Sequence, residues 1–315
     1  SSNISRKYIC TYEECRCNTD ATLLVALSDN VIPDTEKFYK IIKVGLLHVR
    51  TDKIVTFGIK PTYPETGYGY LELHLDVLDK SGTSELVAFI EKPNVKQAEK
   101  MINAGNFLWN AGIFLFRAQD MIDAFEYYAP ETLNFVLKAF NHSSSDLGFL
   151  RLGEEPWSMI KNISIDYAIM EKAQNLVAVP YTAKWSDLGG WDSVWAESNP
   201  DHLGNVTSKS AYEIECSNSL LRSENANQHV VGIGLNNILA VAMPDAVLIA
   251  NKKRAQDVKM VVELLKKNNV SQAEIYPKDH RPWGWFESLA LGDSFQVKRI
   301  CVKPGAALSL QSHKH

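Results

Sequence analysis

Residues 53–73 read KIVTFGIKPTYPETGYGYLEL, and two further apolar stretches follow, VAFIEKP at 87–93 and FLWNAGIFLF at 107–116. The apolar runs within these stretches are typical of buried strands. Polar groups interrupt the runs, and a charged group among apolar residues costs free energy unless it is paired or bound to something. We therefore expect a polar pocket built on strand ends, formed by Glu65, Tyr68, Gly69, Glu91, Lys92 and Asn110.

Composition excludes several classes of protein. The chain has 315 residues, of which 45% are hydrophobic, and this suits roughly two domains with a sizeable core. The net charge is -4, and Lys and Arg form no stripe that nucleic acid would need. No apolar segment approaches the roughly 20 residues of a membrane helix, and residues 1–30 lack a secretory signal pattern. We expect a cytoplasmic protein with no nucleic-acid or membrane partner.

The first two thirds of the chain alternate strands and helices. An apolar run at 23–27 ends at Asp29, which indicates a buried strand with a carboxylate at its C-terminal end, where open α/β sheets bind ligands. A helix is predicted from about residue 33 to 49, followed by a strand at 54–59. Further helices are predicted at 94–103, 119–128, 130–140 and 164–173.

The pattern changes near residue 201. Short segments rich in Val, Ile and Leu recur at close intervals up to about residue 254, which predicts a small β domain such as a short β-helix. A new β-rich unit that is too short to bury its own core begins at residue 281. The expected domains are 1–200, a β domain with a closing helix at 201–270, a linker at 271–280, and a truncated unit at 281–315.

Three polar segments could bind a ligand, and each has a structural alternative. Lys92 can hold a phosphate and Glu91 can accept hydrogen bonds from hydroxyl groups, or the two form an exposed ion pair. The glycines on either side of Tyr68 either let backbone amides approach a ligand or form a tight turn. Asn110 lies between apolar residues, so its amide must find partners in the protein or on a ligand.

Two aspartates are candidate ligands of Mg²⁺. Asp29 follows the first predicted strand, and Asp187 lies in a glycine-rich loop flanked by tryptophans. Mg²⁺ usually takes one or two carboxylates together with substrate phosphates. Each aspartate alone is better explained as a turn or cap residue, and it is their combination that favours a metal site.

The order of the motifs resembles a known family. SDN at 28–30, ETGYGY at 65–70, FIEKP at 89–93, WNAGIF at 109–114, SIDYAIMEK at 164–172 and KWSDLGGW at 184–191 are similar to motifs of the mannose-1-phosphate guanylyltransferases. The resemblance is to the long bacterial type, which is fused to a mannose-6-phosphate isomerase domain of the cupin fold. It implies an α/β fold with a Rossmann-like nucleotidyltransferase core that lacks its N-terminal part, then a short β-helix and the start of a cupin.

The same resemblance implies a reaction and a set of roles. GTP and mannose 1-phosphate would give GDP-mannose and pyrophosphate, with Mg²⁺ as the cofactor. Such an in-line displacement needs alignment and charge neutralisation more than it needs a base. Asp166 would order the pocket wall. The implied catalytic residues are Asp29, Lys92 and Asp187, with Mg²⁺ on the two aspartates, and the implied substrate-binding residues are Glu65, Tyr68, Gly69, Glu91, Lys92, Asn110, Gly112 and Asp166.

The chain departs from this family at both ends. The family begins with a glycine-rich loop that holds the triphosphate, whereas here no glycine precedes Gly45. His313 and His315 match the first two ligands of a cupin metal site, whose other ligands would lie beyond the terminus. We therefore expect a truncated chain with impaired transfer. Two alternatives stay open, the isomerase part of a bifunctional enzyme and a non-catalytic sugar-phosphate binder. A homodimer is a further expectation.

Overall fold

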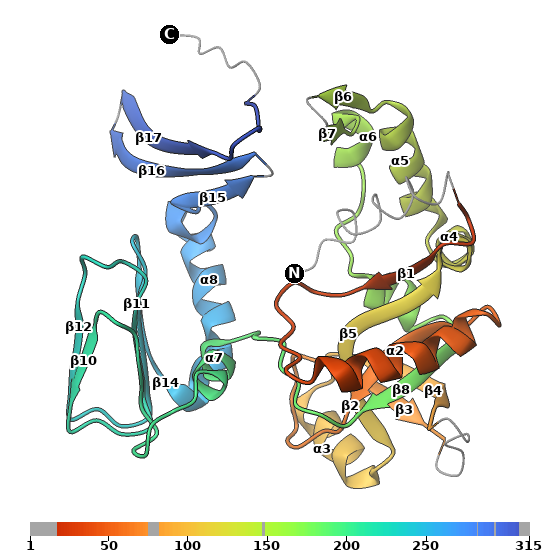
Figure 1. The fold of residues 1–315 in the computed structure, drawn as a ribbon, viewed down its shortest axis with the longest axis horizontal. Helices are drawn as coiled ribbons and strands as arrows, with labels where there is room; N and C mark the ends of the chain where they lie inside the picture. Colours follow the sequence, from red (N-terminus) through yellow and green to blue (C-terminus); the bar gives the residue numbers. More distant parts are fainter. Residues whose placement is uncertain (1–17, 75–81, 147–148, 282, 293, 309–315) are drawn as a thin grey trace. The chain divides into compact units, whose positions relative to one another are not determined.

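The computed structural model describes residues 18–74, 82–146, 149–281, 283–292 and 294–308. The chain divides into two compact units, Ser1–Asp187 and Leu188–His315 (Figure 1). Each unit has its own buried apolar clusters.

The first unit is built on a six-stranded mixed sheet. β2 (Ile54–Ile59) and β8 (Leu176–Tyr181) pair in parallel, whereas β5 (Phe107–Arg117) runs antiparallel to both β1 (Thr22–Val25) and β2. As a result β1, β2 and β8 point the same way, and their carboxyl ends meet at one edge of the sheet. The strand order is β1 (Thr22–Val25), β5 (Phe107–Arg117), β2 (Ile54–Ile59), β8 (Leu176–Tyr181), β4 (Ser84–Glu91) and β3 (Gly69–Leu73), and β3 also pairs with the start of β5.

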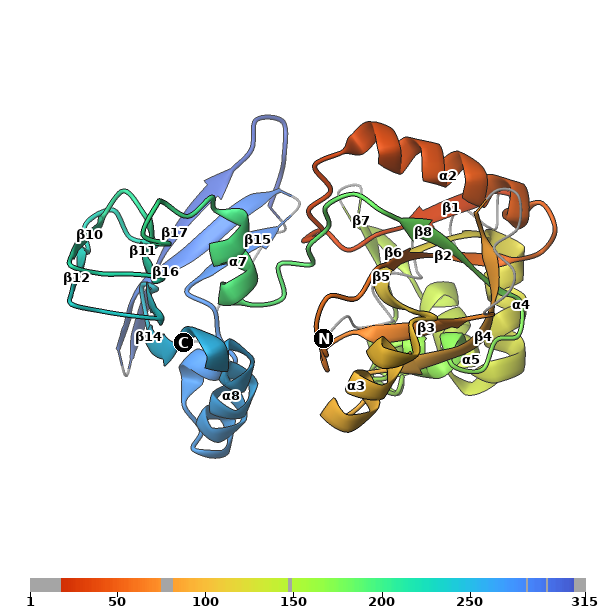
Figure 2. The same cartoon turned by 90° about the horizontal axis from the view of Figure 1, so that it is seen from below.

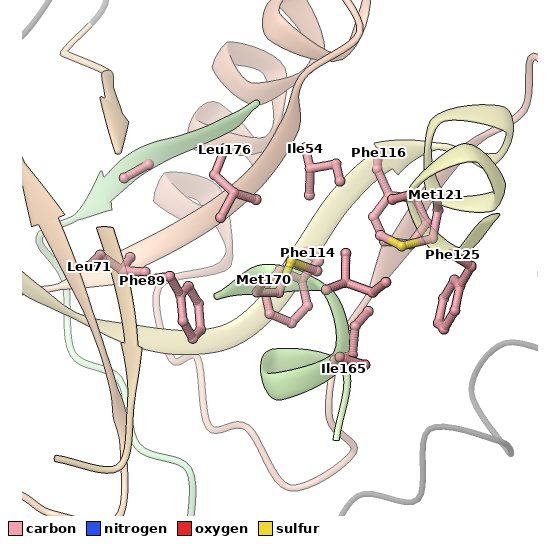
Figure 3. Close-up of a cluster of buried hydrophobic side chains, with 14 residues drawn as sticks. Ile54, Leu71, Phe89, Phe114, Phe116, Met121, Phe125, Ile165, Met170 and Leu176 are labelled. Carbon is pink, nitrogen blue, oxygen red and sulfur yellow. The ribbon is translucent and has the colours of Figure 1, made fainter. Parts of the chain in front are cut away.

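Helices cover both faces of this sheet. α2 (Thr35–Val49) packs on one face, and α4 (Ala118–Tyr128) and α5 (Pro130–Asn141) lie on the other (Figure 2). Side chains along β5 alternate between the two clusters, with Phe114 and Phe116 in the cluster that contains Met121 and Met170 (Figure 3) and Ile113 and Leu115 in the cluster beneath α2. A strand buried on both faces needs apolar residues at consecutive positions, which explains the unbroken run IFLF.

Most predicted helices of this unit are confirmed. α3 (Val95–Ala104) begins at a capping box, in which Asn94 Oδ1 accepts a hydrogen bond from Gln97 N at 3.0 Å and Gln97 Oε1 accepts one from Asn94 N at 3.1 Å. It ends at Gly105, whose φ of 78° is left-handed. The helix expected at 164–173 is different, because the structure has a π-helix, η1 (Asp166–Met170). A short helix and a hairpin complete the unit, α6 (Glu154–Ser158), β6 (Ser144–Asp146) and β7 (Phe149–Arg151).

The second unit contains the expected short β-helix. β9 (Val206–Thr207), β11 (Leu220–Ser223) and β13 (Ile238–Ala242) pair in parallel on one side, and β10 (Ala211–Ile214) pairs in parallel with β12 (Val230–Ile233) on the other. β14 (Val247–Asn251) then adds to β13 in the antiparallel sense, and it is followed by η2 (Lys252–Asp257) and α8 (Val258–Lys267). Parallel strands of two to five residues joined by short turns are typical of this architecture.

The structure adds two details to the expected domain organisation. Residues 191–197, which the expected boundary places in the first domain, form α7 (Trp191–Glu197) in the second unit. There Trp191 and Trp195 pack against Leu220 and Leu239. The segment expected as a linker contains η3 (Ser271–Ala273) and the first residues of β15 (Lys278–Arg281). β15, β16 (Gly284–Gly292) and β17 (Phe295–Val302) form an antiparallel sheet, and all 8 residues of β17 are exposed. The expected boundaries stay predictions.

Two further predictions concern a metal site at the C-terminal end and membrane-spanning helices. His313 and His315 lie outside the described residues, so the expected start of a cupin metal site is not part of the structure. Across the described part of the chain, no helix has the length and apolar character needed to cross a bilayer.

Candidate active site

The centre of the candidate site is the turn at the end of β4. Glu91 is the last residue of the strand, and Lys92 follows with a left-handed φ of 47°. Lys92 Nζ lies 2.9 Å from Glu91 Oε1; the Glu91 side chain is 6% exposed and that of Lys92 is 49% exposed. The sequence left open that Glu91 and Lys92 form an exposed ion pair. Because the Glu91 carboxylate is buried, the structure does not have such a pair.

Burial and neighbouring charges perturb both groups. Burial raises the pKa of Glu91, and the charge of Asp166 raises it further, while the hydrogen bond from Lys92 works in the opposite direction. For Lys92, burial would lower the pKa, but its hydrogen bond to Glu91 and the negative charges of Glu91 and Asp166 outweigh burial and raise it above 10.5. The ammonium group therefore stays charged, beside two carboxyl groups that can accept hydrogen bonds.

Gly69 lies directly opposite Glu91 in the β3–β4 ladder. A Cβ atom on this glycine would come within 2.7 Å of Glu91 Oε2 and within 3.2 Å of the Phe89 ring. The sequence left two roles open for this glycine, a close approach of the backbone to a ligand and a tight turn. In the structure the missing side chain makes room for the Glu91 carboxylate, so Gly69 shapes the site.

Glu65 closes the turn that precedes β3. Its side chain is buried, and Oε1 accepts a hydrogen bond from Gly67 N at 2.7 Å. Its carbonyl oxygen accepts another from Tyr70 Oη at 2.9 Å. The structure thus supplies the tight turn that the sequence left as one alternative, while substrate binding by Glu65 stays a prediction.

The amide of Asn110 is buried in β5 and oriented by the protein. Oδ1 accepts hydrogen bonds from Thr56 Oγ1 at 2.9 Å and from Gly112 N at 3.1 Å, and Gly112 itself has a left-handed φ of 67°. The other end of the amide, Nδ2, lies 3.5 Å from Asp166 Oδ1. Asp166 in turn influences Glu91 and Lys92 electrostatically. Four predicted site residues, from the end of β4, the turn after it, β5 and η1, are therefore brought together.

Tyr68 connects this cluster with Asp187. Its hydroxyl donates a hydrogen bond of 2.7 Å to Asp187 Oδ1. Its ring lies edge-on between Trp109 and Trp185, at centroid distances of 5.3 and 5.6 Å. Burial strongly raises the pKa of Tyr68, and the charge of Asp187 raises it further, so the hydroxyl stays protonated as a donor.

The loops that carry Asp29 and Asp187 lie side by side. Val31 and Ser186 exchange backbone hydrogen bonds of 2.8 and 3.2 Å. Trp185 Nε1 also donates to Asn30 Oδ1 at 2.7 Å. The loops follow β1 and β8, whose carboxyl ends share one edge of the sheet, the usual place for a ligand in such folds.

The donor set at this edge suits a cation that shares its ligands with a substrate. Within the described ranges, no group of three or more His, Cys, Asp or Glu residues is placed to hold a metal ion. Asp29 and Asp187 would therefore supply only part of a coordination shell. Mg²⁺ commonly binds through one or two carboxylates and completes its shell with water and phosphate oxygens.

Glu171 belongs to the site, although it was not among the predicted residues. Its Oε1 accepts a hydrogen bond of 2.9 Å from the backbone N–H of Glu91. The motif SIDYAIMEK contained this glutamate. Its direction depends on the π-turn of η1, which the sequence pattern did not indicate.

Three family models match the chain. Residues 8–202 match the nucleotidyl transferase family, residues 210–265 match the MannoseP isomerase/GMP-like β-helix domain, and residues 268–315 match the C-terminal domain of mannose-6-phosphate isomerase. The order of the three matches agrees with the predicted nucleotidyltransferase core, β-helix and cupin start. The expected fold class is confirmed.

Known relatives resemble the chain over nearly its whole length. It is 38% identical over 307 residues to the xanthan biosynthesis protein XanB of Xanthomonas campestris pv. campestris (strain ATCC 33913), covering 98% of this chain and 64% of that protein. It is 39% identical over 300 residues to a mannose-1-phosphate guanylyltransferase of Salmonella montevideo, covering 94% and 63%. The chain thus spans less than two thirds of the length of these relatives.

A solved structure supports the same assignment. The protein described as mannose-1-phosphate geranyltransferase from Thermus thermophilus superposes with a TM-score of 0.70 at 25% identity, over 84% of this chain and 75% of that one. The resemblance inferred from the motifs is confirmed. Because the family match at residues 8–202 covers more than half of the sequence, the chain belongs to the nucleotidyl transferase family.

Proposed function

We propose that this chain transfers GMP from GTP to mannose 1-phosphate, which yields GDP-mannose and pyrophosphate. One observation carries the proposal: the buried carboxylate of Glu91, paired with the half-exposed ammonium of Lys92, lies beside Asn110 and Asp166 in a nucleotidyl transferase fold. A relative with 39% identity is named for this activity. Relatives named for xanthan and alginate biosynthesis make polysaccharide synthesis a fitting use of the product.

The cluster offers complementary groups to each part of a hexose 1-phosphate. Glu91 and Asp166 can accept hydrogen bonds from hydroxyl groups, and Asn110 Nδ2 can donate one. Lys92 Nζ is accessible enough to meet a phosphate while it stays paired with Glu91. A polyhydroxylated anion therefore suits this cluster better than an apolar ligand does.

The proposed reaction is an in-line displacement. An oxygen of the sugar phosphate forms a bond to the α-phosphorus of GTP, and the bond from that phosphorus to the oxygen bridging to the β-phosphate breaks. The released electron pair leaves with pyrophosphate. Lys92 holds the attacking phosphate and offsets its repulsion from the triphosphate, while Glu91 and Asn110 fix the sugar so that the attacking oxygen is aligned.

We also propose Mg²⁺ as the cofactor, held by Asp29 and Asp187. The donor set fits, because both residues supply hard carboxylate oxygens from loops that are hydrogen-bonded to each other. When bound, the cation would neutralise charge on the phosphate oxygens. The chain's own contribution is the direction of the Asp187 carboxylate, which Tyr68 fixes by its hydrogen bond.

An isomerase activity is a second candidate, favoured by the match of residues 268–315 to the C-terminal domain of mannose-6-phosphate isomerase. The described part of that match includes η3 and the sheet formed by β15, β16 and β17. The non-catalytic sugar-phosphate binder is a third candidate, because the cluster around Glu91 would serve binding as well as transfer. The expected homodimer stays a prediction.

The deciding experiment is a product assay on the purified chain. GTP and mannose 1-phosphate with Mg²⁺ are expected to give GDP-mannose and pyrophosphate, resolved by ion-exchange chromatography. Lys92→Met should abolish the product, whereas Lys96→Met, on the exposed surface of α3, should not. Conversion of mannose 6-phosphate without formation of GDP-mannose would favour the isomerase. Binding of mannose 1-phosphate without turnover would favour the binder.

A further inference from the structure

Glu91 reaches into the site from a strand end that is fixed from two directions. On one side, β3 pairs with β4, and Lys92 N donates a hydrogen bond of 3.1 Å to Tyr68 O. On the other side, β8 pairs with Ser84 and Glu85, at the opposite end of β4 from Glu91. The N–H of Glu91 instead donates to Glu171 Oε1 at 2.9 Å. A carboxylate thus caps this end of the strand.

The π-helix explains how Glu171 reaches this position. Glu171 N donates a hydrogen bond of 2.9 Å to Asp166 O, which joins residues five apart, as a π-turn does. One turn therefore carries two acidic side chains with different partners, Asp166 beside Asn110 and Glu171 beside the backbone of Glu91. π-Turns are rare in proteins, but many of those that occur lie at functional sites. They redirect side chains that a regular helix would place elsewhere.

We infer that Glu171 is a positioning residue, whose hydrogen bond to the Glu91 amide aims the Glu91 carboxylate and the Lys92 ammonium at the sugar phosphate. The identity of the substrate in this inference rests on the proposed function. The hydrogen bond from the Glu91 amide to Glu171 does not depend on that function. Lys92 has a left-handed φ of 47°, which a non-glycine residue adopts at a cost, so the turn needs external support. The two hydrogen bonds on consecutive amides, to Tyr68 and to Glu171, provide this support.

Glu171→Ala and Glu171→Gln form a matched pair for the test. Glutamine keeps an acceptor oxygen at the same reach, whereas alanine removes it. In Glu171→Ala we expect the KM for mannose 1-phosphate to rise about tenfold or more, the range for loss of a hydrogen bond to a charged group, with the KM for GTP unchanged. Glu171→Gln should remain close to the parent protein. Glu126→Ala, which removes an exposed glutamate from α4, is the charge control.

Amide hydrogen exchange at Glu91 gives a readout that does not depend on turnover. In Glu171→Ala, exchange of the Glu91 amide should accelerate about tenfold or more, while the Lys92 amide, bonded to Tyr68, should change less. Unchanged exchange at Glu91 would overturn the inference, even in an active enzyme. Equal KM changes in the alanine and glutamine variants would overturn it as well. If the parent chain shows no transfer, the proposed function fails, and the exchange result still decides the positioning role.

Discussion

The hydroxyl of Tyr68 donates a hydrogen bond of 2.7 Å to Asp187 Oδ1, across 119 positions of sequence. The bond joins the turn before β3 to the loop after β8. Because the Tyr68 ring is held edge-on by Trp109 and Trp185, the direction of the hydroxyl is fixed. The proposed metal carboxylate and the proposed sugar cluster are therefore linked by one residue, whose hydroxyl bonds Asp187 and whose carbonyl oxygen accepts a hydrogen bond from Lys92 N.

Tyr68→Phe should weaken cation binding while leaving the ring packing in place. Removing a side chain that orients a metal-binding carboxylate typically costs about 10- to 100-fold in affinity or activity. We expect a shift of that size in the Mg²⁺ concentration for half-maximal turnover. Titration with Mn²⁺, followed by electron paramagnetic resonance, should show the same loss without substrate.

Tyr127→Phe is the matched control, because it removes an exposed hydroxyl from α4. It should leave both the Mg²⁺ and the Mn²⁺ titrations unchanged. If Tyr68→Phe binds Mn²⁺ as tightly as the parent protein does, the hydrogen bond to Asp187 has no part in cation binding.

Asp187→Asn and Asp29→Asn should each abolish turnover in a protein that still folds. Both changes conserve shape but remove a negative charge from the proposed Mg²⁺ ligands. Thermal unfolding should show folded variants, and Mn²⁺ binding should be lost. Asp245→Asn, at an exposed turn before β14, should behave as the parent protein does. Full activity in Asp187→Asn would refute the metal assignment.

Local signals in the sequence were sufficient to predict most elements of the first unit. The run at 54–59 is apolar because both of its faces are covered, and it forms β2 with the predicted bounds. Asn94 and Gly105 mark the ends of α3 because a capping side chain and a left-handed residue act within one helical turn. Such signals need no knowledge of the tertiary fold.

The precise contacts of the site were not predictable in the same way. Thr56 meets Asn110 across 54 positions, and Glu171 meets Glu91 across 80. These contacts depend on the strand order and on a π-turn, and neither leaves a periodic pattern in the sequence. The motifs singled out Asn110 and Glu91 as candidate site residues, but the groups that orient them became visible only in the structure.

Glu91→Gln should change the pH dependence of stability. The pKa of Glu91 in the folded state is raised above its ordinary 4.5, chiefly by burial. The folded state therefore holds this proton more tightly than the unfolded state does. Its contribution to stability is complete below about pH 4.5 and is lost as the pH rises through the raised pKa. As the pH rises over this range, the free energy of unfolding of the parent protein should fall relative to that of Glu91→Gln. Urea unfolding at constant ionic strength measures the difference.

Glu85→Gln provides a control of opposite sign. Glu85 is exposed, and a hydrogen bond from Lys53 at 2.6 Å lowers its pKa below 4.5. Its contribution is present above about pH 4.5 and is lost as the pH falls through the lowered pKa. Relative to Glu85→Gln, the parent protein should gain stability as the pH rises. The same trend in both pairs would show that the buried environment of Glu91 is not responsible.

Gly69→Ala should displace the Glu91 carboxylate. The added Cβ would meet Glu91 Oε2 at 2.7 Å and the Phe89 ring at 3.2 Å, so the effect is steric. Overpacking of this kind costs about 1–3 kcal/mol of stability. Because the displaced group is the proposed sugar ligand, the KM for mannose 1-phosphate should rise as well.

Gly45→Ala separates the two effects in the Gly69 experiment. Its Cβ would come within 3.1 Å of Leu115 and 3.2 Å of Val55, in the cluster beneath α2, away from Glu91. This variant should lower the unfolding temperature and leave the KM for mannose 1-phosphate unchanged. If both glycine variants raise KM equally, general loosening of the fold explains the result. If Gly69→Ala lowers the stability but leaves the KM for mannose 1-phosphate unchanged, Glu91 does not bind the sugar from the position that Gly69 allows.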